Sequence, residues 1–176
     1  MSCSLVPSCV ADSIYALTPA ALAAHGIRLV LADLDNTLTS YEDSMPCGRL
    51  KAWKTELESN GITLFVVSNS RKSHRCPDFC AALGIGCVRH AGKPGIDGVL
   101  RALKETGHTA DQALMVGDQI FTDVCGANRA GVRSVLVKPI AIGKNPFRAV
   151  RYAIESPFRW LGCRRCRVRE SGGTVQ

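Results

Sequence analysis

Short apolar runs recur along the chain, each of a length that suits a β-strand. They are rich in Val, Leu and Ile and lack the polar alternation of a half-exposed sheet. They lie at residues 27–32, 62–67, 87–89, 113–116 and 134–137. Uninterrupted apolar runs of this kind are typical of strands that are buried on both faces.

Longer stretches with helical spacing separate these runs. They lie at residues 46–60, 71–83, 95–106 and 123–130, and a glycine follows each one, at Gly61, Gly84, Gly107 and Gly131. Glycine is the residue that most often ends a helix. The alternation of strands and helices predicts a three-layer α/β/α sandwich with a mainly parallel central sheet.

The composition is that of an ordinary globular domain, with 176 residues of which 46% are hydrophobic and 21% charged. No apolar run approaches the ~18 residues needed to cross a membrane. The first residues lack basic side chains before an apolar stretch, so we expect no secretory signal. Nine cysteines form an odd set and predict mostly free thiols in a reducing compartment. We therefore expect an intracellular protein, in the cytoplasm or on the matrix side of an organelle.

Positive charge is concentrated near the C-terminus. Nine Lys and Arg and a single acid, Glu155, lie between Lys138 and Arg169, whereas the rest of the chain is nearly neutral. We therefore divide the chain into a main domain, residues 1–141, and a basic tail, residues 142–176. Such an asymmetry indicates an anionic partner, either a membrane or a nucleic acid.

Apolar residues of the tail recur at three- and four-residue steps and define one helical face. They are Phe147, Val150, Ile154, Phe158 and Leu161. Arg148, Arg151 and Arg159 lie mostly off that face, and Pro157 should kink the helix. A basic amphipathic helix with Phe and Trp predicts peripheral binding to an anionic phospholipid surface, with no nucleic acid expected. The alternative is a solvated helix packed on the domain.

Polar residues follow the predicted strands, where ligands bind in parallel sheets. Asp33 and Asp35 follow the first strand as a pair of carboxylates, which a divalent cation such as Mg²⁺ can neutralise. Ser68 and Asn69 follow the second strand and can hydrogen-bond a phosphate oxygen. Lys93 lies between two glycines and can place a positive charge on a phosphate.

A second acid pair, Asp118 and Asp123, follows a later strand and can complete a metal site. Together these groups suit phosphoryl transfer through a covalent aspartyl phosphate. One carboxylate attacks phosphorus while the metal and Lys93 offset the repulsion between the negative charges. A second carboxylate protonates the leaving alkoxide and then deprotonates water. Asp123 could instead be only the N-cap of the helix that follows.

The strings DLDNTLT, VVSNS, AGKP and GDQIFTDV closely resemble the four motifs of the haloacid dehalogenase (HAD) superfamily. The resemblance implies a HAD-like, Rossmann-type fold in which Asp33 is the nucleophile and Asp35 the general acid/base. Ser68 and Lys93 match the second and third motifs. The implied Mg²⁺ ligands are the side chains of Asp33 and Asp118 and the backbone carbonyl of Asp35, with Asp123 in support.

Over residues 5–165 the motifs look like those of the YqeG-like, type IIIA subgroup, which includes phosphatidylglycerophosphatases of mitochondria and plastids. The resemblance implies hydrolysis of phosphatidylglycerophosphate to phosphatidylglycerol. The spacing between motifs leaves no room for a sizeable cap domain, so the site should admit large substrates. The alternatives are a phosphatase for a phosphoprotein, nucleotide or sugar phosphate, and a non-enzymatic module that binds nucleic acid or ribosomes through the tail.

One cysteine-rich string, formed by Cys76, Cys80, Cys87 and His90, resembles a zinc ligand set. The first two fall on a predicted helix and the third on a buried strand, so buried, apolar cysteines are the favoured interpretation. The Cys163-Arg-Arg-Cys166 segment lacks a second pair and gives only a weak metal signal.

Overall fold

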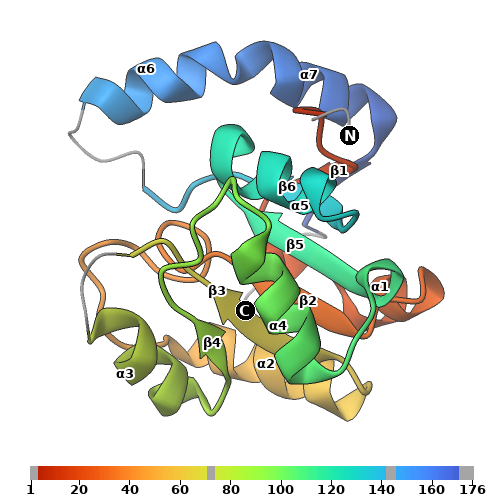
Figure 1. The fold of residues 1–176 in the computed structure, drawn as a ribbon, viewed down its shortest axis with the longest axis vertical. Coiled ribbons are helices and arrows are strands. Elements are labelled where there is room, and N and C mark those ends of the chain that lie inside the picture. Colours follow the sequence, from red (N-terminus) through yellow and green to blue (C-terminus); the bar gives the residue numbers. More distant parts are fainter. Residues whose placement is uncertain (1–3, 71–73, 142–145, 171–176) are drawn as a thin grey trace, which may run out of the picture.

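A seven-stranded sheet forms the centre of the protein in the computed structural model (Figure 1), with all its described strand pairs parallel. The structure describes residues 4–70, 74–141 and 146–170, with side chains of the last range given from residue 150. The strand order is β4-β3-β2-β5-β6-β1-β7. The strands are β1 Cys9–Ala11, β2 Leu29–Ala32, β3 Thr63–Val67, β4 Cys87–Val88, β5 Ala113–Gly117, β6 Arg133–Val137 and β7 Arg167–Val168.

The central strands are buried on both faces, which explains their lack of polar alternation. Leu29 and Leu31 of β2 belong to one apolar cluster, and Val30 and Ala32 belong to the cluster on the opposite face. All four residues are fully buried. This arrangement confirms the predicted α/β sandwich.

Helices cover both faces of the sheet. They are α1 Pro19–Ala24, α2 Gly48–Ser59, α3 Arg75–Leu83, α4 Asp97–Thr106, α5 Cys125–Arg129, α6 Pro146–Ile154 and α7 Ser156–Arg165. Leu22, Trp53 and Phe79 bring α1, α2 and α3 into the first cluster. Val99 and Ala127 bring α4 and α5 into the second.

The predicted helices are found, with shifts at their ends. Gly84 and Gly107 end α3 and α4 in the left-handed conformation, at φ 70°. The helix predicted at 123–130 begins earlier, as a π-helical turn over Ile120–Val124 that continues into α5. The first residues of the helix predicted at 71–83 lie outside the described residues. Helix α1 and strands β1 and β7 were not predicted.

The described part of the basic tail packs on the sheet. Helices α6 and α7 lie end to end along one side of the molecule (Figure 1), and the break between them at Glu155 is next to Pro157, as predicted. A Cβ on Gly162 of α7 would lie 2.5 Å from Pro7 Cγ, so this helix approaches the domain closely. Strand β7 pairs with β1 and therefore extends the sheet formed by residues 1–141.

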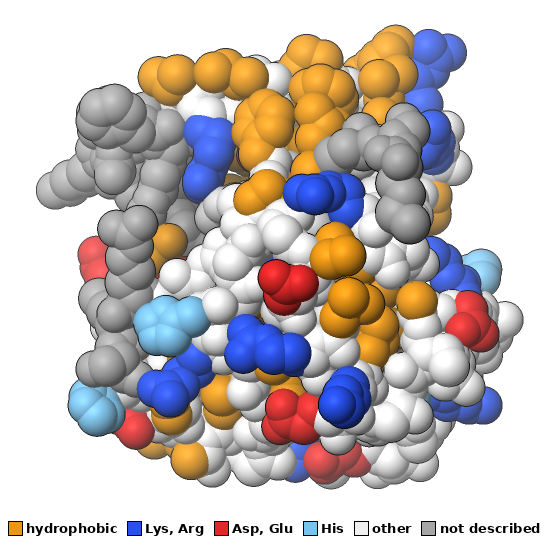
Figure 2. Space-filling model, in the orientation of Figure 1, with side chains coloured by type: hydrophobic (Ala, Val, Ile, Leu, Met, Phe, Trp, Pro, Cys, Tyr) orange, Lys and Arg blue, Asp and Glu red, His pale blue; other side chains and the backbone are white. Residues whose placement is uncertain are grey.

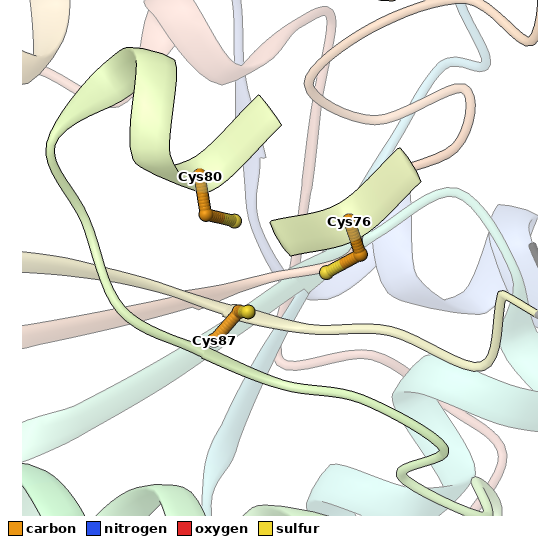
Figure 3. Close-up of side chains that lie close together, drawn as sticks. All are labelled: Cys76, Cys80 and Cys87. Carbon is orange, nitrogen blue, oxygen red and sulfur yellow. The ribbon is translucent and has the colours of Figure 1, made fainter. Parts of the chain in front are cut away.

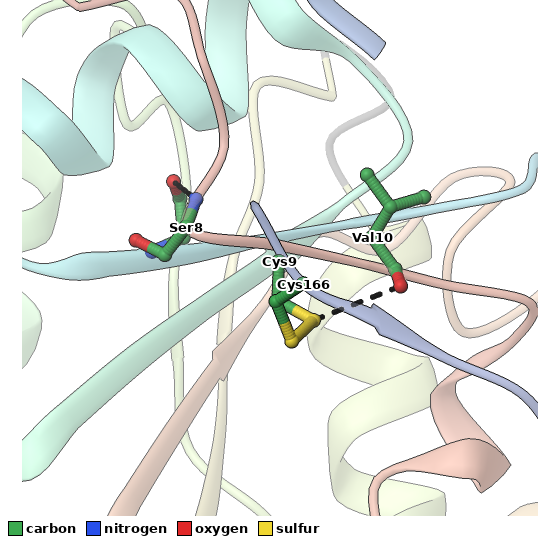
Figure 4. The surroundings of a disulfide bond; sticks show 5 residues. Ser8, Cys9, Val10 and Cys166 are labelled. Atoms are coloured by element: carbon green, nitrogen blue, oxygen red, sulfur yellow. Dashed lines mark hydrogen bonds between the residues drawn. A yellow bond between two sulfur atoms is a disulfide. The ribbon is translucent and has the colours of Figure 1, made fainter. Parts of the chain in front are cut away.

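A disulfide joins Cys9 of β1 to Cys166, next to β7 (Figure 4). These two residues are exceptions to the expectation of mostly free thiols. Outside this disulfide, the described cysteines include free thiols at Cys47, Cys76, Cys80, Cys87 and Cys163. Cys166 is bonded to Cys9, whereas Cys163 is a free thiol. The two cysteines of the Cys-Arg-Arg-Cys segment therefore do not form a pair with each other.

In the part of the chain that the structure describes, the segments after the strands are short. Among the described residues, a loop alone joins β2 to α2, and only α3 separates β3 from β4. The predicted absence of a sizeable cap domain thus agrees with the described chain. None of the helices searched over these residues is both long and apolar enough to cross a membrane.

Candidate active site

The first acid pair lies where strand β2, an inner strand of the sheet, ends. The backbone N–H of Asp33 donates to the carbonyl of Val116, at 2.9 Å, and so carries the β2–β5 pairing up to the carboxylate. Asn36 then adopts a positive φ of 67°, and its N–H donates to Thr39 at 2.7 Å. This turn keeps Asp33 and Asp35 at the mouth of the sheet, where both are buried.

Lys93 links the first acid pair to the second. Its Nζ lies 2.7 Å from Oδ1 of Asp33 and 2.7 Å from Oδ1 of Asp123. Burial alone would lower the pKa of Lys93, but the charges of the two carboxylates outweigh it and raise the pKa above its ordinary value. Lys93 therefore stays an ammonium group at neutral pH.

The segment after β3 supports this lysine. The side-chain amide of Asn69 donates to the carbonyl of Lys93 at 2.8 Å, and its Oδ1 accepts from the N–H of Lys93 at 3.0 Å. The described contacts of Asn69 thus position the lysine loop, whereas its predicted role in substrate binding stays a prediction. Ser68 Oγ accepts from the N–H of Ser70 at 3.0 Å and lies at the cavity described below.

Three carboxylates converge between β2 and β5. One oxygen from each of Asp33, Asp118 and Asp123 lies within 4.8 Å of the others. Asp123 approaches so closely that a Cβ on Gly117 would lie 2.3 Å from its Oδ2. Its side chain contacts Lys93 from within the π-helical turn, so the alternative that Asp123 is only an N-cap is wrong.

Burial and mutual repulsion disfavour the charged forms of two of these acids. Burial, followed by the charges of Asp123 and Asp33, raises the pKa of Asp118 to about 8. Burial likewise raises the pKa of Asp123 to about 6, against the opposing effect of Lys93. Oδ1 of Asp118 is buried and makes no hydrogen bond to the described residues. An all-oxygen donor set with an unpartnered carboxylate oxygen fits Mg²⁺.

Asp35 has a different partner. Its Oδ1 accepts from Nε of Arg75, the first residue of α3, at 2.9 Å in a largely buried ion pair. The Asp35 side chain is therefore not one of the three clustered carboxylates, and a metal contact through its backbone carbonyl stays a prediction. Sequence reasoning missed Arg75, whose only signal is its position shortly after the SNS string.

A cavity of about 190 Å³ opens over these groups. It is lined by Asp33, Asp35, Ser68, Asn69, Lys93 and Asp123, with Tyr41, Ser70, Gln119, Thr122 and Arg151. Arg151 comes from α6 and donates to Oε1 of Gln119 at 2.9 Å. The structure thus brings all but one of the predicted residues to one cavity. The exception, Asp118, lines a second cavity with Arg151 and keeps a carboxylate oxygen within 4.8 Å of those of Asp33 and Asp123.

Comparisons with known proteins agree with this geometry. Residues 90–139 match the family described as HAD-hydrolase-like. The chain is 32% identical to the probable phosphatase YqeG of Bacillus subtilis over 136 residues, which cover 77% of this chain and 78% of that one. The chain therefore belongs to the HAD-type hydrolases and, among them, to the YqeG-like family of phosphatases.

A chloroplast protein is also related. The chain is 32% identical over 153 residues to phosphatidylglycerophosphate phosphatase 1 of Chlamydomonas reinhardtii, covering 82% of this chain and 57% of the algal one. The chain thus spans a little over half the length of that relative.

The solved 3-deoxy-D-manno-octulosonate 8-phosphate phosphatase of Yersinia pestis superposes with a TM-score of 0.50 at 15% identity, covering 81% and 85% of the two chains. This likeness concerns the fold alone.

Proposed function

We propose that this phosphatase hydrolyses phosphomonoesters with Mg²⁺ and through a phosphoryl group carried by Asp33. The observation that supports this most strongly is the position of Asp33, which shares one ammonium group and one carboxylate cluster with Asp118 and Asp123. Bound Mg²⁺ would offset the negative charges of the phosphate and the carboxylates. Asp33 and Asp118 would hold it by their side chains.

The protein side chains divide the proton and phosphoryl transfers between them. Lys93 contacts Oδ1 of Asp33, and we assign the attack on phosphorus to the other oxygen. As the bond between phosphorus and the leaving group breaks, Asp35 donates a proton to the alkoxide oxygen of the leaving group. Asp35 then accepts a proton from a water molecule, which attacks phosphorus and releases Asp33. Arg75 holds Asp35 by one oxygen and orients the other for these transfers.

For the substrate we propose phosphatidylglycerophosphate. The related algal protein is named for this substrate, and the described site has no cap that would exclude a lipid headgroup. This headgroup carries a terminal phosphomonoester and an internal phosphodiester. Arg151 lies at the same cavity as Lys93 and can neutralise the internal phosphate while the terminal one meets Asp33.

The face of the tail that points to solvent supports docking to a membrane. Val150, Ile154, Trp160 and Leu161 are exposed large apolar residues of α6 and α7. Figure 2 shows hydrophobic side chains gathered over these helices at the top of the view, with basic side chains nearby. The guanidinium of Arg164 lies 4.7 Å from the centre of the Trp160 ring. Apolar and cationic side chains together are what an anionic lipid surface attracts.

The predicted tail pattern is only partly correct. Phe158 is half-buried, with its ring centre 6.4 Å from that of Phe121, because the helix rests on the domain there. Arg159 stacks at 4.0 Å on Tyr152, and Arg151 turns toward the active site. These two arginines therefore do not supply the surface charge. The side chains of Phe147 and Arg148 lie outside the described residues.

Two assays test the proposal. We expect Asp33→Asn to lower kcat on a soluble chromogenic phosphoester by at least about 1,000-fold, while the exposed control Asp97→Asn stays near wild type. Chelation of divalent cations should abolish the wild-type activity, and Mg²⁺ should restore it. Activity that survives either Asp33→Asn or chelation overturns the mechanism.

The second assay offers phosphatidylglycerophosphate in mixed micelles. The proposal predicts release of inorganic phosphate and formation of phosphatidylglycerol. Cleavage of the soluble ester without cleavage of the lipid would reject the lipid substrate and leave the phosphatase mechanism intact.

A further inference from the structure

Three thiols that are separate in the sequence meet between α3 and β4. Cys76 and Cys80 lie one turn apart on α3, and Cys87 opens β4. Their sulfur atoms all lie within 4.8 Å of one another, and Figure 3 shows the side chains pointing toward a common centre. The turn at Gly84 reverses the chain after α3 and so brings the edge strand under the helix.

This grouping differs from the interpretation that the sequence favoured, in which these cysteines are separate, buried apolar residues. Cys76 and Cys80 are fully buried, whereas Cys87 is half-buried, so one side of the cluster can be reached from solvent. His90, which the sequence string offered as a fourth ligand, is exposed and is not part of the described group. The donor set is therefore three sulfurs with an open fourth position.

We propose that Cys76, Cys80 and Cys87 bind a thiophilic divalent cation such as Zn²⁺, with water in the fourth position. Zinc–sulfur bonds of about 2.3 Å place the sulfurs of a tetrahedral site about 3.8 Å apart, which the three thiols reach with small side-chain rotations. Three thiolates with a divalent ion leave one negative charge in this partly buried place, and a monovalent ion would leave two. The divalent ion is thus favoured over Cu⁺.

Ligand chemistry separates this site from the active site. Mg²⁺ prefers oxygen ligands, such as the Asp33, Asp118 and Asp123 cluster, whereas thiolates select soft ions. Each cluster offers only one type of donor atom. The two ions can therefore be bound at the same time without exchanging places.

The position of the thiol site gives it a structural consequence. It would tie α3 to β4, a two-residue strand at the edge of the sheet. Arg75, which orients Asp35, immediately precedes Cys76. Binding of the ion would therefore stabilise the element that presents Arg75 to the active site, and its effect should be visible in stability even without substrate.

Cadmium absorbance tests the site directly, because only thiolate ligands give the sulfur-to-cadmium charge-transfer band. We expect the reduced full-length protein, in excess Mg²⁺, to bind one Cd²⁺ per chain with this band. Cys76→Ser and Cys87→Ala should each lose it. The exposed control Cys47→Ser and the double variant Cys9→Ser/Cys166→Ser should retain it.

Thermal unfolding provides a second measurement. Zn²⁺ should raise Tm of the wild type and of Cys47→Ser by several degrees in excess Mg²⁺, and should leave Tm of Cys87→Ala unchanged. Cys87 is only half-buried, so Cys87→Ala keeps the test valid if Cys76→Ser fails to fold. The proposal is overturned if the wild type shows no charge-transfer band, or if Cys87→Ala shows the same band and the same shift in Tm.

Discussion

Asp118 is the single residue whose charge depends most on what the site binds. Its raised pKa of about 8 means that the metal-free folded protein holds a proton that the unfolded chain releases near its ordinary pKa of 3.8. Between these two pH values the native state binds more protons than the unfolded state, so its stability falls as pH rises.

We therefore predict that the free energy of unfolding of the metal-free protein drops by about 2–4 kcal/mol more between pH 5 and pH 8 than that of Asp118→Asn. Urea unfolding in the presence of a chelator measures the free energy of unfolding of the wild type and of Asp118→Asn. Saturating Mg²⁺ should remove most of the difference, because it binds the deprotonated carboxylate. Equal pH slopes for the two metal-free proteins would show that Asp118 is not the group that titrates.

Gly117 makes room for the second acid pair. A Cβ there would lie 2.3–2.5 Å from atoms of the Asp123 side chain, whereas a Cβ on Gly48 meets nothing within 4 Å. Gly117→Ala should lower the free energy of unfolding by about 1–3 kcal/mol through overpacking and should lower kcat by moving Asp123 away from Lys93. Gly48→Ala is the matched control and should keep wild-type kcat. Unchanged kcat in Gly117→Ala would contradict the close approach.

Among individual residues, the sequence predicted those that directly follow strands. Asp33 and Lys93 were found because each follows an apolar run or a glycine, and the fold brings such strand ends together. Arg75 and Arg151 were not found as site residues, because an isolated arginine in a helical stretch gives no local signal. Only the packing of α3 and α6 shows which acids and amides they reach.

Among the elements, the junction of α6 and α7 matters most for the site. Glu155 at this junction is buried, and its Oε1 accepts from the N–H groups of Ile120 at 3.0 Å and Phe121 at 3.4 Å. Burial raises the pKa of Glu155, and these two N–H donors oppose that rise. The tail thereby fixes the start of the turn that follows Asp118.

Glu155→Ala should therefore lower the free energy of unfolding by about 2 kcal/mol, because it leaves the buried N–H of Ile120 and the partly buried N–H of Phe121 without this acceptor. It should also lower kcat on the soluble ester about tenfold by releasing the loop that carries Asp118. Glu105→Ala, a change to an exposed helical glutamate of α4, is the control and should change neither quantity. A Glu155→Ala protein with full stability and kcat would show that the junction does not support the site.

For the same reason, a chain ending before Pro146 loses more than the proposed membrane-binding face. It lacks β7, Glu155 and Arg151, so we expect it to lose activity on the soluble ester as well as on lipid. Strands β1 and β7, of three and two residues, were not predicted. Each is defined by pairing with a partner distant in the sequence, which local periodicity cannot reveal.

For the whole molecule, the exposed apolar side chains of α6 and α7 lie on the same tail that sends Arg151 into the active-site cavity. Adsorption of this face to a bilayer would hold the cavity close to lipid headgroups. The sequence predicted the amphipathic character of the tail. It did not predict that Phe158 and Arg159 turn inward, because the helical face that packs on the domain depends on tertiary contacts.

We predict that Ile154→Ser combined with Trp160→Ser reduces co-sedimentation with anionic phospholipid vesicles at least about tenfold, since each removes buried apolar contact with the bilayer. The activity on lipid should fall in parallel, whereas kcat on the soluble ester should not change. Leu100→Ser, at an exposed apolar residue of α4, should bind vesicles like the wild type. Equal vesicle binding by the double variant and the wild type would exclude this face as the membrane contact.

The account depends above all on a phosphoryl group bonded to Asp33, and borohydride trapping tests this most directly. Borohydride reduces an aspartyl phosphate to homoserine, which mass spectrometry of the peptide around residue 33 detects. We predict homoserine at position 33 when substrate and Mg²⁺ are both present. With the soluble chromogenic ester, whose leaving group departs without a proton, we predict more of it in Asp35→Asn, which cannot activate water to release Asp33. Turnover without any modification of Asp33, or trapping at another residue, would contradict the account.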